Sequence, residues 1–228
     1  MRHSLLSPSP RDARWVEVAT ELRTGILRGD WAPGTHLKES ELAKRFQVSR
    51  GPVRETIRVL VREGLVETRS NGRTIVRGMT PQDVSDLYRL RLAIESLAVT
   101  QATERASNQA LEPLKRLVDG MKELAEPGRE ATRLDVGFHE ALVVLSRNRP
   151  LQEAWRGIAA TVMGLLDVTN RYYSDFSHIC GLHEEILAAV QRRDAAAATR
   201  ALKEHLALGE ATVAALYQDL TAREDSLA

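Results

Sequence analysis

Four side chains in the second half of the chain have the types and the spacing of metal ligands. Asp135 and His139 are four residues apart, so on a helix both project from one face, as two ligands of one ion must. His183 and His205 follow in two further segments that are rich in apolar residues. Three imidazoles and one carboxylate suit zinc, nickel, manganese or iron, and a water or a ligand carboxylate can fill an open position.

The neighbours of these four residues predict that all of them face the interior of a helical structure. The apolar neighbours are Leu134, Phe138, Leu142, Leu182, Ile186, Leu187, Leu202, Leu206 and Leu208. A single histidine in such a place is more often hydrogen-bonded to a neighbour than bound to a metal. Spacing alone therefore leaves both interpretations open.

A second set of chemically capable side chains is a row of arginines. Arg50, Arg54 and Arg58 follow one another at i, i+4 steps, so they line one edge of a helix. A guanidinium group can fork onto O6 and N7 of guanine or pair with a phosphate, and an α-helix fits the major groove of DNA. The row indicates a DNA-reading helix, and the alternative is an ordinary solvated helix face.

The elements around the row favour the first interpretation. A short helix, a turn at Gln47 and a favourable N-cap at Ser49 lead into the arginine helix, which Gly64 ends. The buried stripe of the two helices is expected to contain Leu42, Ala43, Phe46, Val53, Ile57, Leu60 and Val61. Only the acids Glu55 and Glu63 stand nearby, so a ladder of ion pairs explains the row poorly.

Two further elements complete a DNA-binding module. Short strands are predicted at residues 66–68 and 74–77, where the Asn71-Gly72 dipeptide is a hairpin signal and Arg73 makes the tip basic. Upstream, an amphipathic helix is expected with Val16, Ala19, Leu22, Arg23 and Ile26 on its buried face. Three helices and a wing make a winged helix-turn-helix.

The distribution of charge divides the chain in two. Residues 1–78 contain 15 Lys and Arg against 9 Asp and Glu, a balance of +6, and residues 79–228 contain 17 against 22, a balance of −5. The net charge of +1 hides this asymmetry, which is typical of a nucleic-acid-binding domain joined to a second domain. We therefore expect a DNA-binding domain over residues 1–78 and an effector-binding and dimerisation domain over residues 79–228.

The second part is predicted to be entirely helical. Thr80-Pro81-Gln82-Asp83 is a helix start, and Leu87, Leu90, Ala93, Ile94, Leu97 and Ala98 follow at helical spacing. Further helices are expected at 109–124, 129–146, 151–172, 176–192 and 195–220. The fold class is therefore mainly α, with an amino-terminal winged helix-turn-helix and a carboxy-terminal antiparallel bundle of six helices.

Composition indicates a cytoplasmic protein without a membrane segment. The longest apolar stretch, residues 158–166, is far shorter than the roughly 18 residues that a membrane span needs, and the first residues lack the apolar core of a signal peptide. The single cysteine, Cys180, excludes an internal disulfide framework and is interpreted as a small buried residue.

The first part resembles the winged helix-turn-helix of the GntR family of bacterial transcription regulators. The resemblance is carried by Pro33-Gly34, Glu41-Leu42-Ala43, Val48-Ser49-Arg50, Pro52-Val53-Arg54-Glu55 and Glu63-Gly64-Leu65. It implies that Ser49, Arg50, Gly51 and Arg54 face the operator, and that the wing residue Gly72 approaches the minor groove. Gln47 stands where the family usually has a turn glycine, and Gly51 stands where Thr or Ser is usual.

Residues 87–220 resemble the FCD ligand-binding domain of the FadR branch of that family. There an Asp, three residues, His pattern is joined by two later histidines, and Asp135, His139, His183 and His205 fill all four positions. The resemblance implies a divalent metal site, zinc being favoured and nickel, manganese or iron being alternatives. It also implies a small organic acid as effector, with Arg91 as its partner, whereas the residues alone equally allow a helix pair between Arg91 and Glu95.

Together these features predict a homodimeric repressor of transcription, not an enzyme, that binds double-stranded operator DNA under control of a small carboxylate metabolite. An alternative from another class is a metal-dependent hydrolase with a DNA-binding tether, in which Glu140 or Glu184 would act as base. A third interpretation gives the metal a purely structural role.

Overall fold

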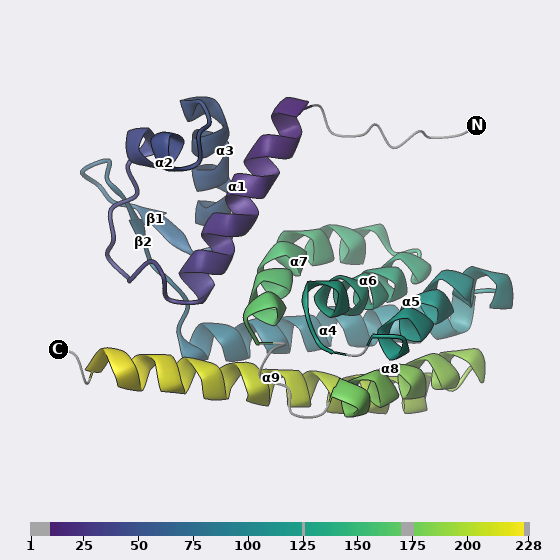
Figure 1. Ribbon diagram of the computed structural model, residues 1–228. Helices are drawn as coiled ribbons and strands as arrows, with labels where there is room; N and C mark the ends of the chain where they lie inside the picture. The colour runs from purple at the N-terminus through teal and green to yellow at the C-terminus, as the bar shows by residue number, and fades with distance from the viewer. Residues whose placement is uncertain (1–9, 125, 170–175, 226–228) are drawn as a thin grey trace. The chain divides into compact units, whose positions relative to one another are not determined.

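The computed structural model describes residues 10–124, 126–169 and 176–225 and shows two compact units, Met1–Met79 and Thr80–Ala228 (Figure 1). Unit 1 contains α1 (Pro10–Leu27), α2 (Glu39–Arg45), α3 (Arg50–Arg62), β1 (Val66–Thr68) and β2 (Thr74–Val76). The strands pair antiparallel, with Val66 opposite Val76 and Thr68 opposite Thr74. The predicted winged helix-turn-helix is confirmed.

The core of unit 1 lies between α1, α3 and the wing, where Leu22, Val53 and Leu60 are fully buried. The prediction that Val16 and Val61 are buried in this core is wrong, because they are 44% and 38% exposed. Val18 and Thr56 are buried in addition. Thr56 tolerates burial because its hydroxyl donates a hydrogen bond to the carbonyl of Trp15, at 3.2 Å.

A buried ion pair joins the first helix to the end of the third. Arg23, expected on the apolar face of α1, donates from Nε and Nη2 to the two carboxylate oxygens of Glu63, each at 2.7 Å. Both side chains are less than a tenth exposed. Removal of either partner would leave a buried charge uncompensated, so the pair fixes how α3 crosses α1.

The turn between α2 and α3 contains a strained residue. Gln47 has a φ of 52°, the left-handed conformation in which a side chain crowds the following carbonyl group at a cost of about 1 kcal/mol. The family pattern of a glycine at this position thus has a physical reason. At the wing, Gly72 has a φ of 78°, and the amide of Arg73 donates to the side chain of Asn71, at 3.0 Å.

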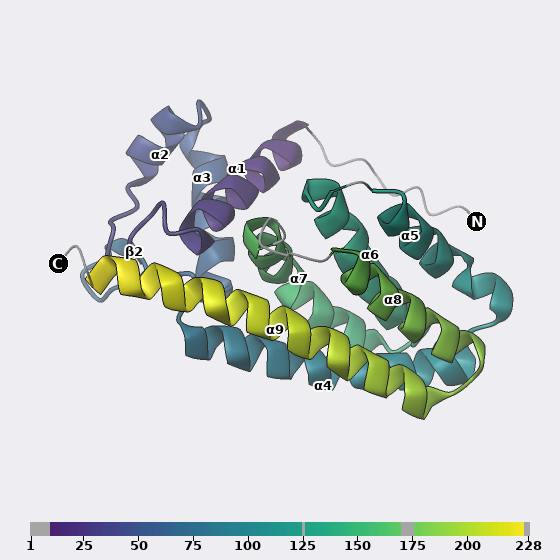
Figure 2. The same ribbon diagram turned by 60° about the horizontal axis from the view of Figure 1, so that its bottom comes forward.

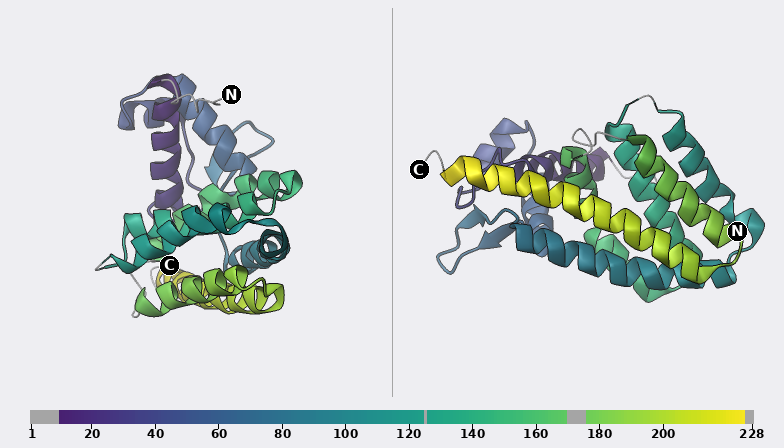
Figure 3. Two further views of the ribbon diagram at one scale, coloured as in Figure 1. Left: turned by 90° about the vertical axis from the view of Figure 1, so that its right-hand side faces the viewer. Right: turned by 90° about the horizontal axis from the view of Figure 1, so that it is seen from below.

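Unit 2 consists of antiparallel helices, as expected (Figure 2). Over its described residues these are α4 (Pro81–Arg105), the 3-10 turn η1 (Asn108–Leu111), α5 (Glu112–Lys122), α6 (Arg129–Leu145), α7 (Arg149–Thr169), α8 (Phe176–Gln191) and α9 (Ala195–Asp225). The longest two, α4 and α9, run side by side in opposite directions (Figure 3). The expected extension of α7 to residue 172 lies outside the described residues.

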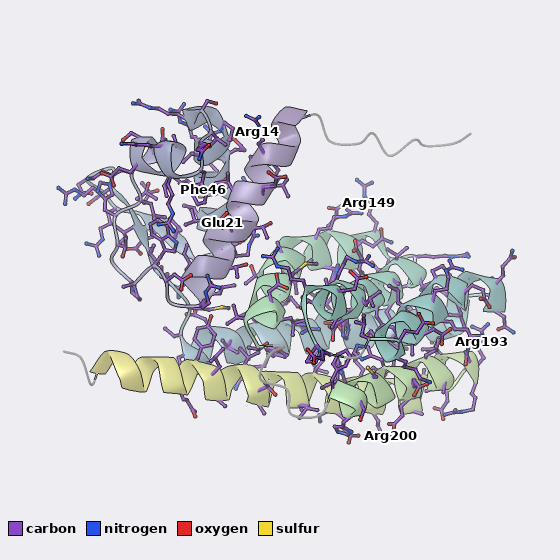
Figure 4. The ribbon with its side chains drawn as sticks, viewed as in Figure 1. Arg14, Glu21, Phe46, Arg149, Arg193 and Arg200 are labelled. Atoms are coloured by element: carbon purple, nitrogen blue, oxygen red, sulfur yellow. The ribbon has the colours of Figure 1, made fainter. Side chains whose placement is uncertain are left out.

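The helix boundaries of unit 2 follow local hydrogen bonds. Thr80 and Asp83 form the predicted capping box at the start of α4. The turn between α8 and α9 is held by Arg193, which has a φ of 62° and donates from Nη1 to the carbonyl of Thr103, at 2.9 Å (Figure 4). This hydrogen bond connects the turn to the end of α4. The cost of the left-handed backbone conformation at Arg193 is therefore offset by a tertiary contact.

The apolar residues of α4 lie on two sides of the helix. Ile94 and Ala98 belong to the buried face, together with Val84, Tyr88, Arg91 and Glu95. Leu90 and Leu97 are each 46% exposed. Helical spacing predicts the helix, but it does not show which of its apolar sides is covered.

None of the helices within the described residues is long and apolar enough to cross a membrane.

Candidate nucleic-acid interface and metal centre

The candidate DNA-reading surface consists of the start of α3 and the tip of the wing. The predicted residues, all of them exposed, are Ser49, Arg50, Gly51, Arg54, Arg58, Gly72 and Arg73. Ser49 occupies the N-cap of α3 in extended conformation, but its hydroxyl makes no capping hydrogen bond. The hydroxyl and the first amides of the helix are therefore available to a phosphate oxygen.

Two of the arginines on this surface form ion pairs with acidic side chains, one of which the sequence did not indicate. Arg54 donates from Nε and Nη2 to Glu39 of α2, at 3.1 and 3.0 Å, and Arg58 pairs with Glu55. Hydrogen bonding from Arg54 lowers the pKa of Glu39, with attraction from Arg50 and Arg58 in addition. Glu39 was missed because it lies on a different helix, and Glu63 belongs to the pair with Arg23 instead.

The candidate metal centre brings together the four side chains that were predicted to be metal ligands. Asp135 and His139 come from α6, His183 from α8 and His205 from α9. One donor atom of each lies within 4.8 Å of the corresponding atoms of the other three. All four residues are buried, and His139 and His183 have no exposed surface.

Neighbouring acceptors fix the orientation of two imidazoles. The carbonyl of Ile179 lies 2.8 Å from Nδ1 of His183, and Oε2 of Glu95 contacts Nδ1 of His139. An acceptor beside Nδ1 favours the tautomer with the proton on that nitrogen and a lone pair on Nε2, which is how histidine ligands are usually arranged. Glu95 was not recognised as part of the site from the sequence, because it lies on α4.

The hydrogen bonding and protonation of the possible ligand atoms show whether these residues fit a cation. The Nε2 atoms of His139 and His205 lie 3.0 Å apart, within hydrogen-bonding distance. Asp135 Oδ1 and His183 Nε2 are buried and have no hydrogen-bond partner among the residues that the structure describes. Burial lowers the pKa of His183 and of His205, so both favour the neutral form that binds metals. Three imidazole nitrogens and a carboxylate oxygen that converge in this way fit one divalent cation.

Arg91 lies beside this centre in a fully buried environment. Its Nε donates to Glu95 Oε1, at 2.9 Å, which confirms the helix pair that the sequence allowed. The guanidinium carbon lies 5.1 Å from the ring centroid of Tyr88 and 5.9 Å from that of Trp155. Arg91 Nη2 and Trp155 Nε1 are buried and make no hydrogen bond within the described residues. The sequence offered no signal for Trp155.

The residues proposed as bases for a hydrolase are not part of the centre. Glu140 is exposed on α6. Glu184 is exposed on α8 and pairs with Lys122 at 2.5 Å. Cys180 is buried, and burial raises the pKa of its thiol, so it is a poor nucleophile.

Comparison with known proteins agrees with both halves of the architecture. Residues 15–76 match the description of bacterial regulatory proteins of the gntR family, and residues 86–208 match the FCD domain. The uncharacterized HTH-type transcriptional regulator YdhC of Bacillus subtilis is 33% identical over 141 residues, which are 60% of this chain and 63% of that protein. The gluconate operon transcriptional repressor of the same organism is 27% identical over 197 residues, 83% of this chain and 81% of that protein.

A solved structure shows the same fold. The putative transcriptional regulator GntR from Rhodococcus sp. RHA1 superposes with a TM-score of 0.62 at 25% identity, covering 88% of this chain and 97% of that chain. The matched families and the named relatives are transcription regulators rather than enzymes. The chain belongs to the gntR family of bacterial regulatory proteins, and its second unit is an FCD domain.

The cluster predicts that removal of one imidazole abolishes stoichiometric metal binding. We expect protein stripped with EDTA and reloaded with Zn²⁺ to hold one ion per chain, and His183→Ala to hold well below one, because three donors remain. Elemental analysis after gel filtration measures this. His178→Ala, an exposed histidine on the same helix, serves as control and should retain one ion. Full retention by a folded His183→Ala variant would remove His183 from the site.

Proposed function

We propose that this protein is a metabolite-responsive repressor of the FadR subfamily. In this proposal unit 1 binds operator DNA as part of a homodimer, and a small organic acid bound beside a divalent ion in unit 2 changes the affinity for DNA. The observation that carries the proposal is the buried cluster of Asp135 and three histidines next to the unpartnered Nη2 of Arg91.

The DNA-binding part of the proposal rests on the exposed start of α3. A helix of this kind enters the major groove with its amino-terminal residues nearest the base edges. Arg50 and Arg54 would therefore read bases, and Arg58, Ser49 and the wing residue Arg73 would contact the backbone. Gly72, with its positive φ, lets the wing turn tightly beside the minor groove.

We expect Arg54→Ala to abolish preferential binding to the operator. One bidentate contact to a guanine contributes about 1–3 kcal/mol of discrimination, so operator affinity should fall by a factor of about 5 to 150. Footprinting and gel shifts on the DNA upstream of the gene measure the effect. Arg62→Ala, an exposed arginine in the last turn of the same helix, is the matched control. An unchanged footprint with Arg54→Ala would contradict the assignment of α3 as the reading helix.

The metal would be held by Asp135, His139, His183 and His205. Nitrogen and carboxylate donors suit zinc best, with nickel, manganese and iron as alternatives. When bound, a divalent ion supplies positive charge that attracts a carboxylate. Glu95 and the carbonyl of Ile179 would keep two of the imidazoles in the orientation that binding needs.

The chemistry around the cluster favours an anionic effector. Asp135 and Glu95 carry carboxylates and Arg91 one guanidinium, so a divalent ion would reverse a formal balance of −1 to +1. Arg91 Nη2 and Trp155 Nε1 are donors without acceptors, which carboxylate and hydroxyl oxygens of an acid would satisfy. The gluconate operon repressor among the relatives makes sugar acids the first class to test.

We expect Trp155→Phe to lower the affinity for the effector acid about tenfold, because it removes one donor and keeps the aromatic ring. Calorimetry with gluconate, lactate, citrate and acetate identifies the acid, and elemental analysis should show unchanged metal content. Trp31→Phe in unit 1 is the control. An equal affinity for the Trp155→Phe variant would exclude Trp155 from the binding site.

The same titration on EDTA-treated protein separates two roles of the metal. Loss of acid binding with an unchanged helical circular dichroism spectrum would support a metal that contacts the effector. Unfolding of unit 2 would show that the metal is structural. For the acid to regulate, it must bind the DNA-competent and incompetent arrangements with different affinities.

The exposed face of α4 supports the homodimer. Leu90 and Leu97 lie seven residues apart on one side of the helix, with exposed Ala93 between them. Apolar residues at such spacing form the seam between two packed helices. A second copy presenting the same face would cover this stripe symmetrically and would give two reading helices for two half-sites.

We therefore expect the double variant Leu90→Glu, Leu97→Glu to be monomeric, because two carboxylates per chain cannot be buried unpaired. Sedimentation velocity at micromolar concentration measures this. Val144→Glu places a charge on another exposed apolar residue, 52% exposed on α6, and should leave the dimer intact. A dimeric double variant would locate the interface elsewhere.

A further inference from the structure

We propose that Glu39 is a positioning residue that sets the sequence selectivity of Arg54. The inference rests on the proposed binding of operator DNA by α3 and concerns a residue outside the set assigned to that surface. Glu39 begins α2, the helix that precedes the reading helix. It would act on DNA through Arg54 and not by contact with a base.

The geometry of the pair leaves the reading edge of Arg54 free. Glu39 accepts from Nε and Nη2 through its two oxygens, at 3.1 and 3.0 Å. A guanidinium group has five N–H donors in one plane, and this fork occupies two of them along one edge. The two donors of Nη1 and the second of Nη2 remain, and they form another edge that can fork onto O6 and N7 of a guanine.

Among the arginines of the row, Arg54 alone is held by a second helix within the described residues. Arg58 pairs with Glu55 of its own helix, three residues away, and Arg50 has no ion pair there. Glu39 is anchored because Leu42 of the same short helix is buried against the core. The guanidinium plane of Arg54 is therefore oriented relative to α3 before DNA arrives.

An oriented side chain increases selectivity more than it increases stability. Exposed ion pairs contribute little to folding, and Arg54 and Glu39 are 55% and 36% exposed. On binding, however, a free arginine must lose rotamer freedom, and an arginine already held in place loses less. The gain applies to a base contact of defined geometry, whereas a phosphate can be met from many orientations.

The negative charge of Glu39 also increases the selectivity for the correct DNA sequence. Its carboxylate is attracted by Arg50, Arg54 and Arg58, and hydrogen bonding from Arg54 keeps its pKa below the usual range. An ionised carboxylate among these arginines reduces the attraction of the surface for phosphates, which supplies nearly all non-specific affinity. Glu39 thus weakens binding to arbitrary DNA while it supports binding to the correct sequence.

The test compares Glu39→Gln with Glu41→Gln. Glu41 is the other acid in the first turn of α2, but it pairs with Lys38 instead of the reading helix. Duplexes selected from a random pool by the wild-type protein, and scrambled versions of them, serve as probes. Dissociation constants are measured for both by fluorescence anisotropy at several salt concentrations.

Both substitutions remove one negative charge, so both should tighten binding to scrambled DNA by a similar factor of about two to three. Only Glu39→Gln should lower the ratio of selected to scrambled affinity, by about tenfold, because glutamine offers one acceptor oxygen and cannot complete the fork. In an Arg54→Lys background, which keeps the charge but lacks the fork, Glu39→Gln should change the ratio less than twofold.

An unchanged ratio for Glu39→Gln, with Arg54→Ala still abolishing selectivity, would overturn the inference and leave the proposed DNA-reading role intact. An equal fall in the ratio for Glu41→Gln would also overturn it, since the effect would then be one of charge alone. Unaltered selectivity in Arg54→Ala would instead refute the reading role of Arg54, on which the inference rests.

Discussion

The helices of unit 2 pack around a small group of polar side chains that are largely shielded from water. Arg91, Glu95, Asp135, His139 and His183 are all less than a tenth exposed in an otherwise apolar bundle. Charged groups in such surroundings are stable only if partners compensate them. Arg91 and Glu95 compensate each other in part, but within the described residues several buried donors and acceptors have no hydrogen-bond partner, which the proposed ion and acid would supply.

Four helices contribute side chains to this polar group. Arg91 and Glu95 come from α4, Asp135 and His139 from α6, and one histidine each from α8 and α9. Phe138 packs edge-on against His139 and His183, and so limits the imidazoles to a narrow range of orientations. The proposed ion and acid would bind between helices that are already in contact, so small changes at the centre would act on several helices at once.

Unit 1 obeys the opposite requirement, since its functional side chains must stay exposed. The buried pair between Arg23 and Glu63 and the apolar core hold α3 from behind, and leave its arginine edge to solvent. The carboxylates of Glu39 and Glu55 reduce the positive charge of that edge and leave its arginines exposed. A surface that is positive but partly compensated favours sequence-dependent contacts over general attraction to phosphates.

What the sequence determined by itself is local and periodic. The spacing of Asp135 and His139, the turn and cap before α3, the Asn-Gly hairpin and the helical character of residues after Thr80 all depend on neighbours within a few positions. The two later ligands, His183 and His205, were brought into the same set by apolar surroundings and family resemblance. Strain at Gln47 was foreseeable from the family resemblance, because a glycine is usual at that position of the turn.

The tertiary structure alone decided which faces are covered and which distant groups meet. The exposure of Leu90, Leu97 and Val61 depends on what packs against each helix, and periodicity does not contain that information. Glu39 meets Arg54, Glu95 meets His139 and Trp155 approaches Arg91 only after separate helices have docked. These contacts arise from the crossing of helices far apart in the chain, whereas a sequence pattern reports only the order of residues along one helix.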